Sequence, residues 1–530
     1  MNMICNSETG DKLSRIPLVK SAKIIQGNAL KIDWNNLDKT KEYDITADVT
    51  NVFEVNEPKV HYETLNVFSK KVNINPTHII QNEFIAKSKY DYILGNPPFI
   101  GKSNKNIEQK ADLERVFSGV KGFGVLDYVT AWYLKAAQYI QNTKTKVAFV
   151  STNSITQGEQ VGVLWNLLFN HYRIKIHFAH RTFQWNNEAR GNAAVHCVII
   201  GFANFDIPEK LIFEYENIKG EAHEIKVKNI NPYLVEGKDI VILSRKTPIC
   251  NVPKIVFGSM PNDNGNLLLS KQEYEDYKKI EPQGAKYIKE FTGGEEFINK
   301  IERFCFWLND INPSELRDCP LLLNRIDNNK NYRLKSSREN TKKLAEYPML
   351  FGEIRQPKSD YILIPNLSSG LRKYIPIGFK SSKVITSNLA LIIPNAKVYH
   401  FGILTSIMHM SWVRYTCGML STSLRYSNNL VYNNFPWPEN PTEKQIKLVE
   451  QSAQKVLDIR AYFPESSLAD LYDPRTMPPA LVKAHQELDK AVDLCYRSQA
   501  FTNESKRIEF LFELYDKYTA DLFTNKKNKN

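Results

Sequence analysis

The feature that most constrains this chain is a short apolar strand, residues 92–95, followed at once by Asn96, Pro97, Pro98 and Phe99. Proline fixes the backbone φ angle and has no N–H, so two consecutive prolines end a strand and stiffen the loop that follows it. The strand therefore leads into a rigid loop that carries one amide and one aromatic ring. An ordinary turn is the alternative interpretation, because asparagine and proline are both common in turns.

The composition of this loop suits methylation of the exocyclic amine of adenine. That amine is a poor nucleophile because its lone pair is delocalised into the ring. The side-chain oxygen of Asn96 and the carbonyl of Pro97 could each accept one N–H of the amine, which would favour a more tetrahedral nitrogen. Phe99 would offer a stacking face to a base swung out of the duplex. Asparagine at the first position favours adenine over cytosine as the target.

Residues 1–205 alternate between segments with strand-like and helix-like patterns. This alternation predicts an α/β fold with a mostly parallel sheet, interrupted by a polar insertion over residues 36–88. The predicted strands cover residues 23–30, 90–95, 146–152, 174–180 and 193–202, and the predicted helices cover residues 126–141 and 157–170.

The rest of the chain changes character twice. Residues 206–250 are predicted to be a connector, and residues 251–434 a mixed β-rich module in which short apolar runs alternate with Gly, Pro, Asn and Ser. Residues 435–530 are predicted to be helical. The first of these helices is expected to begin with Asn440 as its N-cap and Glu443 completing a capping box.

The chain has 530 residues and a net charge of +12, which suits a polyanionic partner such as double-stranded DNA. A generically basic protein is the alternative. The seven cysteines are scattered and form no CxxC pair, which favours reduced thiols and a cytoplasmic location over disulfides or a zinc site. His177 and His180 are expected to be core histidines, so no metal is predicted. No apolar run reaches membrane-spanning length, and we expect no membrane association.

Five segments, taken in order, resemble the MmeI-like family: IIQGNALKIDW, YILGNPPFIGKS, LDYVTAWYLKAA, AFVSTNSITQGEQV and FQWNNEARGNAAVHCVIIGF. The resemblance continues through RYSNNLVYNNFPWP and YDPRTMPPALVKAHQELDKAVD. Members of this family are type II restriction–modification enzymes that join adenine-N6 DNA methylation and cleavage in one polypeptide. The resemblance implies S-adenosylmethionine as the methyl donor and duplex DNA as the substrate. It also implies a partial Rossmann-like class I methyltransferase sheet, a target-recognition domain and a helical C-terminal domain.

The resemblance implies roles for individual residues. The catalytic loop would consist of Asn96, Pro97, Pro98 and Phe99, and the residues beside the adenine of the methyl donor would be Asn28 and Ala29. The pocket around the flipped base would be formed by Asp127, Tyr128, Phe183 and Trp185. Plainer interpretations exist for several of them. Asn28 could be a turn residue, Asp127 could mark the start of a helix, and the two aromatic residues could belong to the core.

Basic and aromatic residues interleave in the 251–434 module, an arrangement that can hold phosphates and base edges. We name Arg372, Lys373, Arg425 and Tyr426 as candidate DNA contacts. Ordinary solvated strand faces are the alternative for each of them. The recognised DNA sequence depends on side-chain geometry and does not follow from the sequence.

One expected feature of a methyltransferase is missing from these residues. The Gly-rich cofactor loop and the acidic strand end that follows it should precede residue 24, and residues 1–23 contain neither. The chain is therefore expected to begin after the cofactor half of the fold, and the family's N-terminal nuclease is expected to be absent. A circular permutation is not supported, since Thr292-Gly293-Gly294-Glu295 lacks the flanking pattern of a cofactor loop.

The sequence thus predicts the C-terminal part of a site-specific DNA methyltransferase that modifies adenine N6. The alternative is a non-catalytic DNA-binding specificity subunit, or a degenerate fragment, that needs an N-terminal partner chain to complete the cofactor site. An RNA methyltransferase is a third hypothesis, which the resemblance of the recognition module disfavours.

Overall fold

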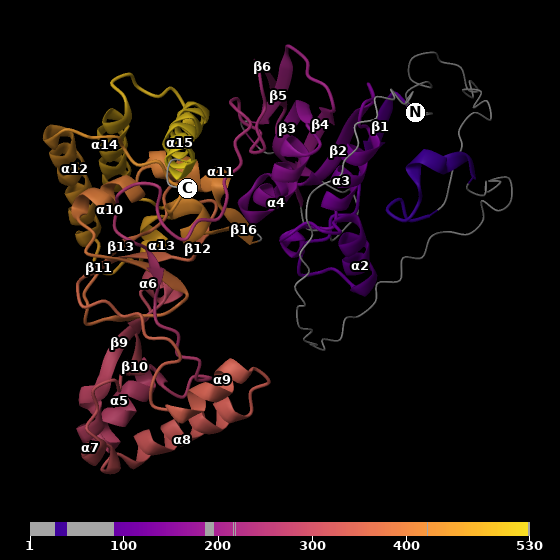
Figure 1. The fold of residues 1–530 in the computed structure, drawn as a ribbon. Coiled ribbons are helices and arrows are strands. Elements are labelled where there is room, and N and C mark those ends of the chain that lie inside the picture. Colours follow the sequence, from indigo (N-terminus) through magenta and orange to yellow (C-terminus); the bar gives the residue numbers. More distant parts are fainter. Residues whose placement is uncertain are drawn as a thin grey trace, which may run out of the picture.

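The computed structural model describes residues 27–39, 90–185, 195–215, 217, 219–420 and 422–527. Figure 1 shows an α/β unit beside a unit of helices and small sheets, with a separate lobe below the latter. The first four residues of the predicted strand 23–30 lie outside the described residues. Its last four belong to a turn, so this part of the prediction is wrong. Most of the polar insertion also lies outside the described residues.

A six-stranded sheet forms the centre of the α/β unit, in the order β1-β2-β4-β3-β5-β6. Its strands are β1 (Tyr92–Gly95), β2 (Lys146–Thr152), β3 (Lys175–Trp185), β4 (Val195–Ala203), β5 (Lys210–Tyr215) and β6 (Ala222–Val227). β1 is parallel to β2, and β3 is parallel to β5. The other three pairings, β2 with β4, β4 with β3 and β5 with β6, are antiparallel.

The prediction of a mostly parallel sheet is therefore wrong for the described strands, because the sheet is mixed. The reason lies in the connections. β3 ends at Trp185 and β4 begins at Val195, whereas parallel neighbours need a crossover of a dozen or more residues. The prediction that residues 206–250 are a connector also needs correction, since this segment supplies β5 and β6 to the sheet.

Three helices accompany this sheet: α2 (Ile107–Val116), α3 (Thr130–Tyr139) and α4 (Gly158–Asn170). The helix predicted over residues 126–141 is confirmed, although it begins at Thr130. Its predicted apolar face is fully buried, at Leu126, Val129, Tyr133, Ala136 and Ile140. This burial fixes which side of α3 faces the sheet.

The module over residues 251–434 contains both strands and helices, so the description β-rich is incomplete. Its described strands form three small sheets: β14-β9-β10-β8, β13-β11-β15-β7 and β12-β17-β16. They are β7 (Val256–Phe257), β8 (Leu268–Ser270), β9 (Ile288–Thr292), β10 (Arg303–Phe306), β11 (Tyr361–Pro365), β12 (Leu367–Ser369), β13 (Gly378–Lys380), β14 (Ile385–Thr386), β15 (Ala390–Pro394), β16 (Gly418–Leu420) and β17 (Ser423–Arg425). The helices are α5 (Lys271–Ile280), α6 (Gly294–Asn299), α7 (Pro313–Arg317), α8 (Pro320–Leu334), α9 (Glu339–Lys343), α10 (Val398–Leu404) and α11 (Ile407–Thr416).

Residues 268–346 of this module form what we call the lower lobe (Figure 1). It has its own hydrophobic core, which includes Tyr277, Phe306 and Leu322. The main core instead runs without interruption from the α/β unit through β11 and α11 to the C-terminal helices. The lower lobe is thus the part of the molecule with the most independent packing.

The predicted helical C-terminal region is confirmed and comprises α12 (Glu443–Ala461), α13 (Leu468–Leu471), α14 (Pro479–Tyr496) and α15 (Glu504–Lys527). The predicted cap of its first helix is wrong. Asn440 has a left-handed φ of 52°, whereas an N-cap is normally extended. Thr442 caps α12 instead and forms a capping box with Gln445. Of the helices in the described part of the chain, none is both long and apolar enough to cross a bilayer.

A buried aspartate joins the helical region to the 251–434 module. The Oδ2 atom of Asp489 in α14 accepts a hydrogen bond of 2.6 Å from the Tyr374 hydroxyl, and its Oδ1 accepts one of 2.7 Å from the Ile407 N–H. Burial raises the pKa of Asp489 to about 6, despite these hydrogen bonds. At pH values between these two pKa values, about 6 in the folded protein and near 3.8 in the unfolded chain, the folded protein keeps a proton on Asp489 that the unfolded chain has released.

The contribution of Asp489 to the free energy of unfolding should fall as the pH rises from about 4 to 6, because the folded state binds more protons than the unfolded state in this range. Asp489→Asn mimics the protonated carboxyl and removes this dependence. We expect the variant to be more stable than wild type at pH 7.5, by about 1–3 kcal/mol, and equal to it near pH 4. Thermal melting of both proteins across this pH range measures the difference. A difference that does not change with pH would contradict the assignment.

Candidate active site

The Asn-Pro-Pro-Phe loop lies at the carboxyl end of β1. Gly95, just before it, packs against the ring of Phe149 on β2, and a Cβ atom at this position would lie 3.0 Å from a ring carbon. Glycine therefore lets the end of β1 approach β2 closely. Asn96 is exposed, and its side chain makes no hydrogen bond to another residue in the described part of the chain. Pro97 is buried and Phe99 is half-buried, so these two residues pack the loop against the rest of the protein.

Residues 126–128 fasten the far end of this loop. The Tyr128 N–H donates to the carbonyl of Ile100 at 2.9 Å, and the Lys102 N–H donates to Oδ1 of Asp127 at 2.8 Å. Both ends of the loop are thus fixed, one by strand pairing and the other by these hydrogen bonds. The sequence predicted Asp127 and Tyr128 in the pocket for the target base, and these hydrogen bonds bring both residues next to the loop after β1.

Asp127 ties two further parts of the unit to the loop, the segments that carry Ser154 and Gln160. Its Oδ2 accepts a 2.5 Å hydrogen bond from the Ser154 hydroxyl, and its N–H donates to Oε1 of Gln160 at 2.9 Å. The buried Lys105 ammonium donates to the neighbouring carbonyl of Leu126. Burial lowers the pKa of Lys105, and the nearby Asp127 opposes this shift. Because both of its carboxylate oxygens are occupied, Asp127 holds the loop in place.

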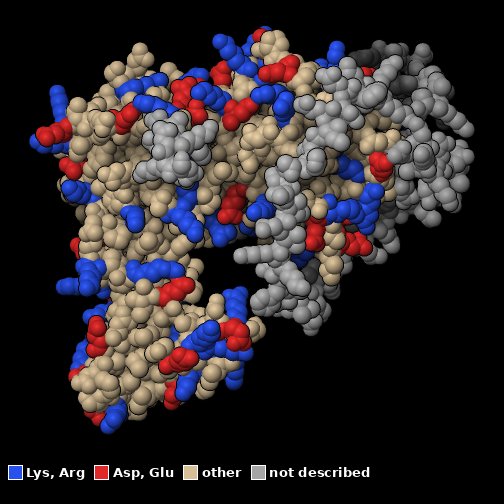
Figure 2. Space-filling view, in the orientation of Figure 1, with Lys and Arg blue, Asp and Glu red and all other residues tan. Residues whose placement is uncertain are grey.

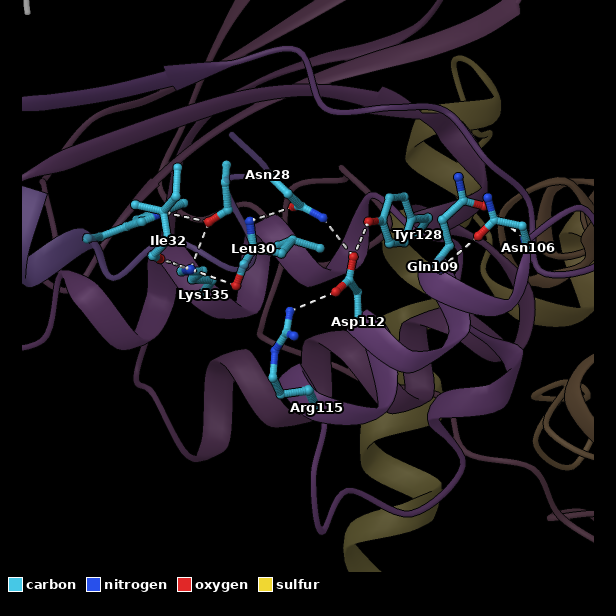
Figure 3. Close-up of polar contacts among 11 residues, drawn as sticks. Asn28, Leu30, Ile32, Asn106, Gln109, Asp112, Arg115, Tyr128 and Lys135 are labelled. Atoms are coloured by element: carbon cyan, nitrogen blue, oxygen red, sulfur yellow. Dashed lines mark hydrogen bonds and ion pairs between the residues drawn. The ribbon is translucent and has the colours of Figure 1, made fainter. Parts of the chain in front are cut away.

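The turn over residues 27–32 is fixed by side chains from α2 and α3 (Figure 3). The Nδ2 group of Asn28 donates to Oδ2 of Asp112 at 2.8 Å, and its Oδ1 accepts the Leu30 N–H at 2.9 Å. The ammonium of Lys135 donates to three carbonyls of the turn, those of Ala29, Leu30 and Ile32. The Asn28 amide thus points at Asp112, and three carbonyls of the turn are bound to one lysine.

Asp112 is a buried carboxylate, with an exposed fraction of 2%. Burial alone would raise its pKa, but hydrogen bonds from Tyr128, Asn28 and Arg115 lower the pKa below its usual value. Burial, together with the hydrogen bond to Asp112, raises the pKa of Tyr128 to about 12. Asp112 is therefore ionised and Tyr128 protonated near neutral pH, so the tyrosine is the donor in their 2.8 Å hydrogen bond.

Phe183 and Trp185 lie at the carboxyl end of β3, which is the same edge of the sheet as the loop after β1. β2 and β4 lie between β1 and β3. The ring of Phe183 stacks on Tyr215 with 5.5 Å between centroids. Trp185 is the last residue of β3 and pairs with Val195. The edge location agrees with an approach of a base from this side, whereas the stacking shows that Phe183 also contributes to packing.

Pairing of β12 with β17 places Leu367 opposite Arg425, close to the turn that carries Arg372 and Lys373. Arg425 and Lys373 are exposed and Arg372 is half-buried, so these three side chains remain candidates for phosphate contact. Figure 2 shows a face hollowed above the lower lobe, with Lys and Arg side chains gathered around the hollow. A hollow with basic walls suits a nucleic acid.

The candidate Tyr426 needs correction as a DNA contact. Its exposed fraction is 2%, and its hydroxyl is hydrogen-bonded at 2.8 Å to Nε2 of the buried His409. A side chain held in this way belongs to the core that supports the β16–β17 hairpin. The spacing of basic and aromatic residues could not show this, because burial depends on packing against α11.

The histidines on β3 take part in local hydrogen bonds. His177 Nε2 is 2.8 Å from the carbonyl of Phe205, and His180 Nδ1 is 2.8 Å from the Tyr215 hydroxyl. In the described part of the chain, no group of three or more His, Cys, Asp or Glu side chains is arranged to hold a metal ion.

Four residues of this region were not found from the sequence: Lys105, Asp112, Lys135 and Gln160. Each is polar, lies on or next to a helix, and binds a segment far away along the chain. Asp112 and Arg115 have the spacing of an ordinary helical ion pair. A local sequence pattern cannot distinguish such an ion pair from one that also holds the turn over residues 27–32.

Comparison with known proteins gives a consistent result. Three family models cover the chain: the MmeI DNA-methyltransferase domain matches residues 1–214, the MmeI target recognition domain residues 236–439, and the MmeI C-terminal domain residues 441–523. DNA methyltransferase A of Bacillus subtilis (strain 168) is 43% identical over 429 residues, which are 81% of this chain and 48% of that protein. The solved structure of the Type IIL restriction-modification enzyme MmeI in complex with DNA is 46% identical, with a TM-score of 0.76, over 98% of this chain and 63% of that one. The chain thus spans about half the length of its curated relative.

Proposed function

Because the chain belongs to the MmeI family, whose members carry a DNA-methyltransferase domain, a target recognition domain and a C-terminal domain, we propose that it methylates adenine N6 in a specific duplex sequence. S-adenosylmethionine is the proposed methyl donor. One observation carries the proposal: the exposed amide of Asn96 lies at a strand end, on a loop fixed at both ends. Hydrogen bonds that reshape a weakly nucleophilic amine require such a preorganised acceptor.

In this proposal Asn96 and the carbonyl of Pro97 each accept one N–H of the flipped adenine. Phe99 stacks on the base from the loop, and Phe183 or Trp185 limits the pocket from the β3 side. Asp127 and Tyr128 keep the loop in position.

Arg372, Lys373 and Arg425 are proposed to contact the DNA backbone. Because the proposed substrate is DNA, we also propose that the protein acts in the cytoplasm.

The turn over residues 27–32 fits the adenine of S-adenosylmethionine through its backbone. The Asn28 side chain is already bound to Asp112 and Leu30. The N–H of Ala29, in contrast, has no hydrogen-bond partner among the described residues. We assign this N–H to a ring nitrogen of the donor's adenine, with Asn28 shaping the turn. When bound, the cofactor supplies an electrophilic methyl group.

A second polypeptide segment is proposed to complete the cofactor site. β1 is hydrogen-bonded on one side only among the described strands, and two of its apolar side chains are exposed, Tyr92 by 65% and Leu94 by 76%. An unpaired strand edge with apolar side chains is a template for a further strand. A segment that carries a Gly-rich loop and pairs here would bring the loop next to residues 27–32.

The rival hypothesis is a specificity subunit that binds DNA without catalysing transfer. Titration calorimetry with S-adenosylmethionine separates the two, first with this chain alone and then with an added polypeptide that supplies the proposed Gly-rich segment. We expect micromolar binding in the presence of that polypeptide, together with N6-methyladenine in nuclease digests of the treated DNA. Site-specific DNA binding with no methylated base in either experiment would favour the rival. Methylated cytosine would contradict the assignment of the target.

A further inference from the structure

One carboxylate oxygen joins two residues that were assigned to different halves of the site. Oδ2 of Asp112 accepts hydrogen bonds of 2.8 Å from Nδ2 of Asn28 and 2.8 Å from the hydroxyl of Tyr128 (Figure 3). Asn28 and Tyr128 come from segments far apart in the sequence. Both therefore depend on the position of one side chain in α2.

Each of these two residues is connected in turn to a functional segment. Asn28 Oδ1 accepts the Leu30 N–H, which shapes the turn that offers the Ala29 N–H. The Tyr128 N–H donates to the carbonyl of Ile100, in the loop that starts at Asn96. A continuous series of hydrogen bonds and short backbone steps thus leads from the cofactor turn, through Asp112, to the catalytic loop.

We propose that Asp112 is a positioning residue that sets the distance and orientation between the cofactor turn and the target-base segment. The inference rests on the proposed function, and it assigns a role to a residue outside both half-sites. Methyl transfer needs the nitrogen, the methyl carbon and the sulfur in line, and misplacement by about 1 Å costs roughly 100-fold in rate. A single acceptor shared by both halves reduces such misplacement.

The chemistry of the site favours a carboxylate over other side chains. A carboxylate only accepts hydrogen bonds, and Asp112 receives donors from Asn28, Tyr128 and Arg115. Hydrogen bonds to a buried charge are stronger than neutral ones. An asparagine could still offer one oxygen to Asn28 and Tyr128, but its amide group would then face the Arg115 guanidinium.

The test compares Asp112→Ala with Arg115→Ala in this chain. Arg115 binds the other oxygen, Oδ1, at 2.7 Å and is largely exposed, so its removal leaves both shared hydrogen bonds intact. Hydrogen exchange followed by mass spectrometry reports the protection of residues 27–32 and 96–104 without any need for activity. We expect Asp112→Ala to lose protection in both segments by about 10-fold or more, and Arg115→Ala to lose it in neither.

Kinetics in the presence of the added polypeptide that supplies the Gly-rich segment provide the second measurement. Asp112→Ala should raise KM for S-adenosylmethionine about 10-fold and lower kcat about 100-fold, with unchanged equilibrium binding to DNA. Tyr128→Phe, which breaks only one of the two hydrogen bonds, should lower kcat and leave KM for the cofactor near wild type. Asp112→Asn should fall between Asp112→Ala and wild type.

Two outcomes would overturn the inference. One is loss of protection in only one of the two segments, and the other is equal behaviour of Asp112→Ala and Arg115→Ala. If Asp112→Ala is globally destabilised, as thermal melting would show, Asp112→Asn and Tyr128→Phe decide the matter. If wild type fails to methylate DNA, the proposed function fails, and the exchange experiment still tests the shared role of Asp112.

Discussion

Asn96→Ala is expected to lower the rate of methyl transfer by at least 100- to 1,000-fold, while affinity for DNA changes by less than about twofold. Removing one preorganised hydrogen-bond partner of a reacting group typically has an effect of this size. Asn96 is exposed at the end of β1 and makes no hydrogen bond to the rest of the described chain, so its loss leaves the fold unchanged. Incorporation of labelled methyl groups into DNA, with gel-shift titration in parallel, measures both quantities.

Two matched variants sharpen this experiment. Asn96→Asp keeps a side-chain acceptor at the same position and should retain more activity than Asn96→Ala. Asn104→Ala removes an equally exposed amide further along the same loop and should behave like wild type. Normal methylation by Asn96→Ala would show that the loop after β1 is not the catalytic loop.

Arg333→Met is expected to have the largest effect on stability, a loss of about 3–5 kcal/mol in the lower lobe. The guanidinium of Arg333 on α8 is completely buried and donates hydrogen bonds to five backbone carbonyls. The acceptors are the carbonyls of Pro261, Asn262, Leu344, Tyr347 and Leu350. Without the guanidinium the carbonyls of Asn262 and Leu350 lose the hydrogen bonds that it supplies, whereas those of Pro261, Leu344 and Tyr347 each keep a backbone N–H donor. A buried carbonyl that is left unsatisfied costs about 1–3 kcal/mol before relaxation.

Because the lower lobe has its own core, the effect of Arg333→Met should stay within this lobe and the adjoining segments 261–262 and 347–350, whose carbonyls the guanidinium binds. Hydrogen exchange should show faster exchange across α5 and α8 and unchanged exchange in β2 and β4. Arg338→Met, which replaces an exposed arginine just after α8, is the control and should be within about 0.5 kcal/mol of wild type. Equal effects of the two variants would show that the buried arginine is dispensable.

Local patterns in the sequence were sufficient for the elements around the loop after β1. The strand before Asn96, the strand over residues 146–152 and the helix over residues 157–170 were all predicted within one or two residues. Their signals are strong because a strand between turn residues and a helix with one apolar face each require a definite spacing. The cap of α12 was misplaced because Asn440 with Glu443 and Thr442 with Gln445 both satisfy the capping-box pattern, and the left-handed backbone of Asn440 excludes the first pair.

Predictions that depended on burial or on long-range pairing were less accurate. Tyr426 looked like a surface aromatic residue next to Arg425, but packing against His409 places it in the core. The sheet looked parallel because strands and helices alternate, but the short connection from β3 to β4 makes it mixed. Tertiary contacts decide such features, because the same local sequence is compatible with either outcome.

The sequence by itself determined that a stiff Asn-Pro-Pro-Phe loop follows a strand, since proline ends a strand regardless of its surroundings. It also determined the family, because the motifs extend over nearly the whole chain. Only the tertiary structure decided which residues hold the loop and the turn over residues 27–32. Asn28 and Asp112 are 84 positions apart, and Lys135 lies more than 100 positions from the carbonyls it binds. Pairings at such separations follow from how α2 and α3 pack against the sheet, and no local pattern encodes them.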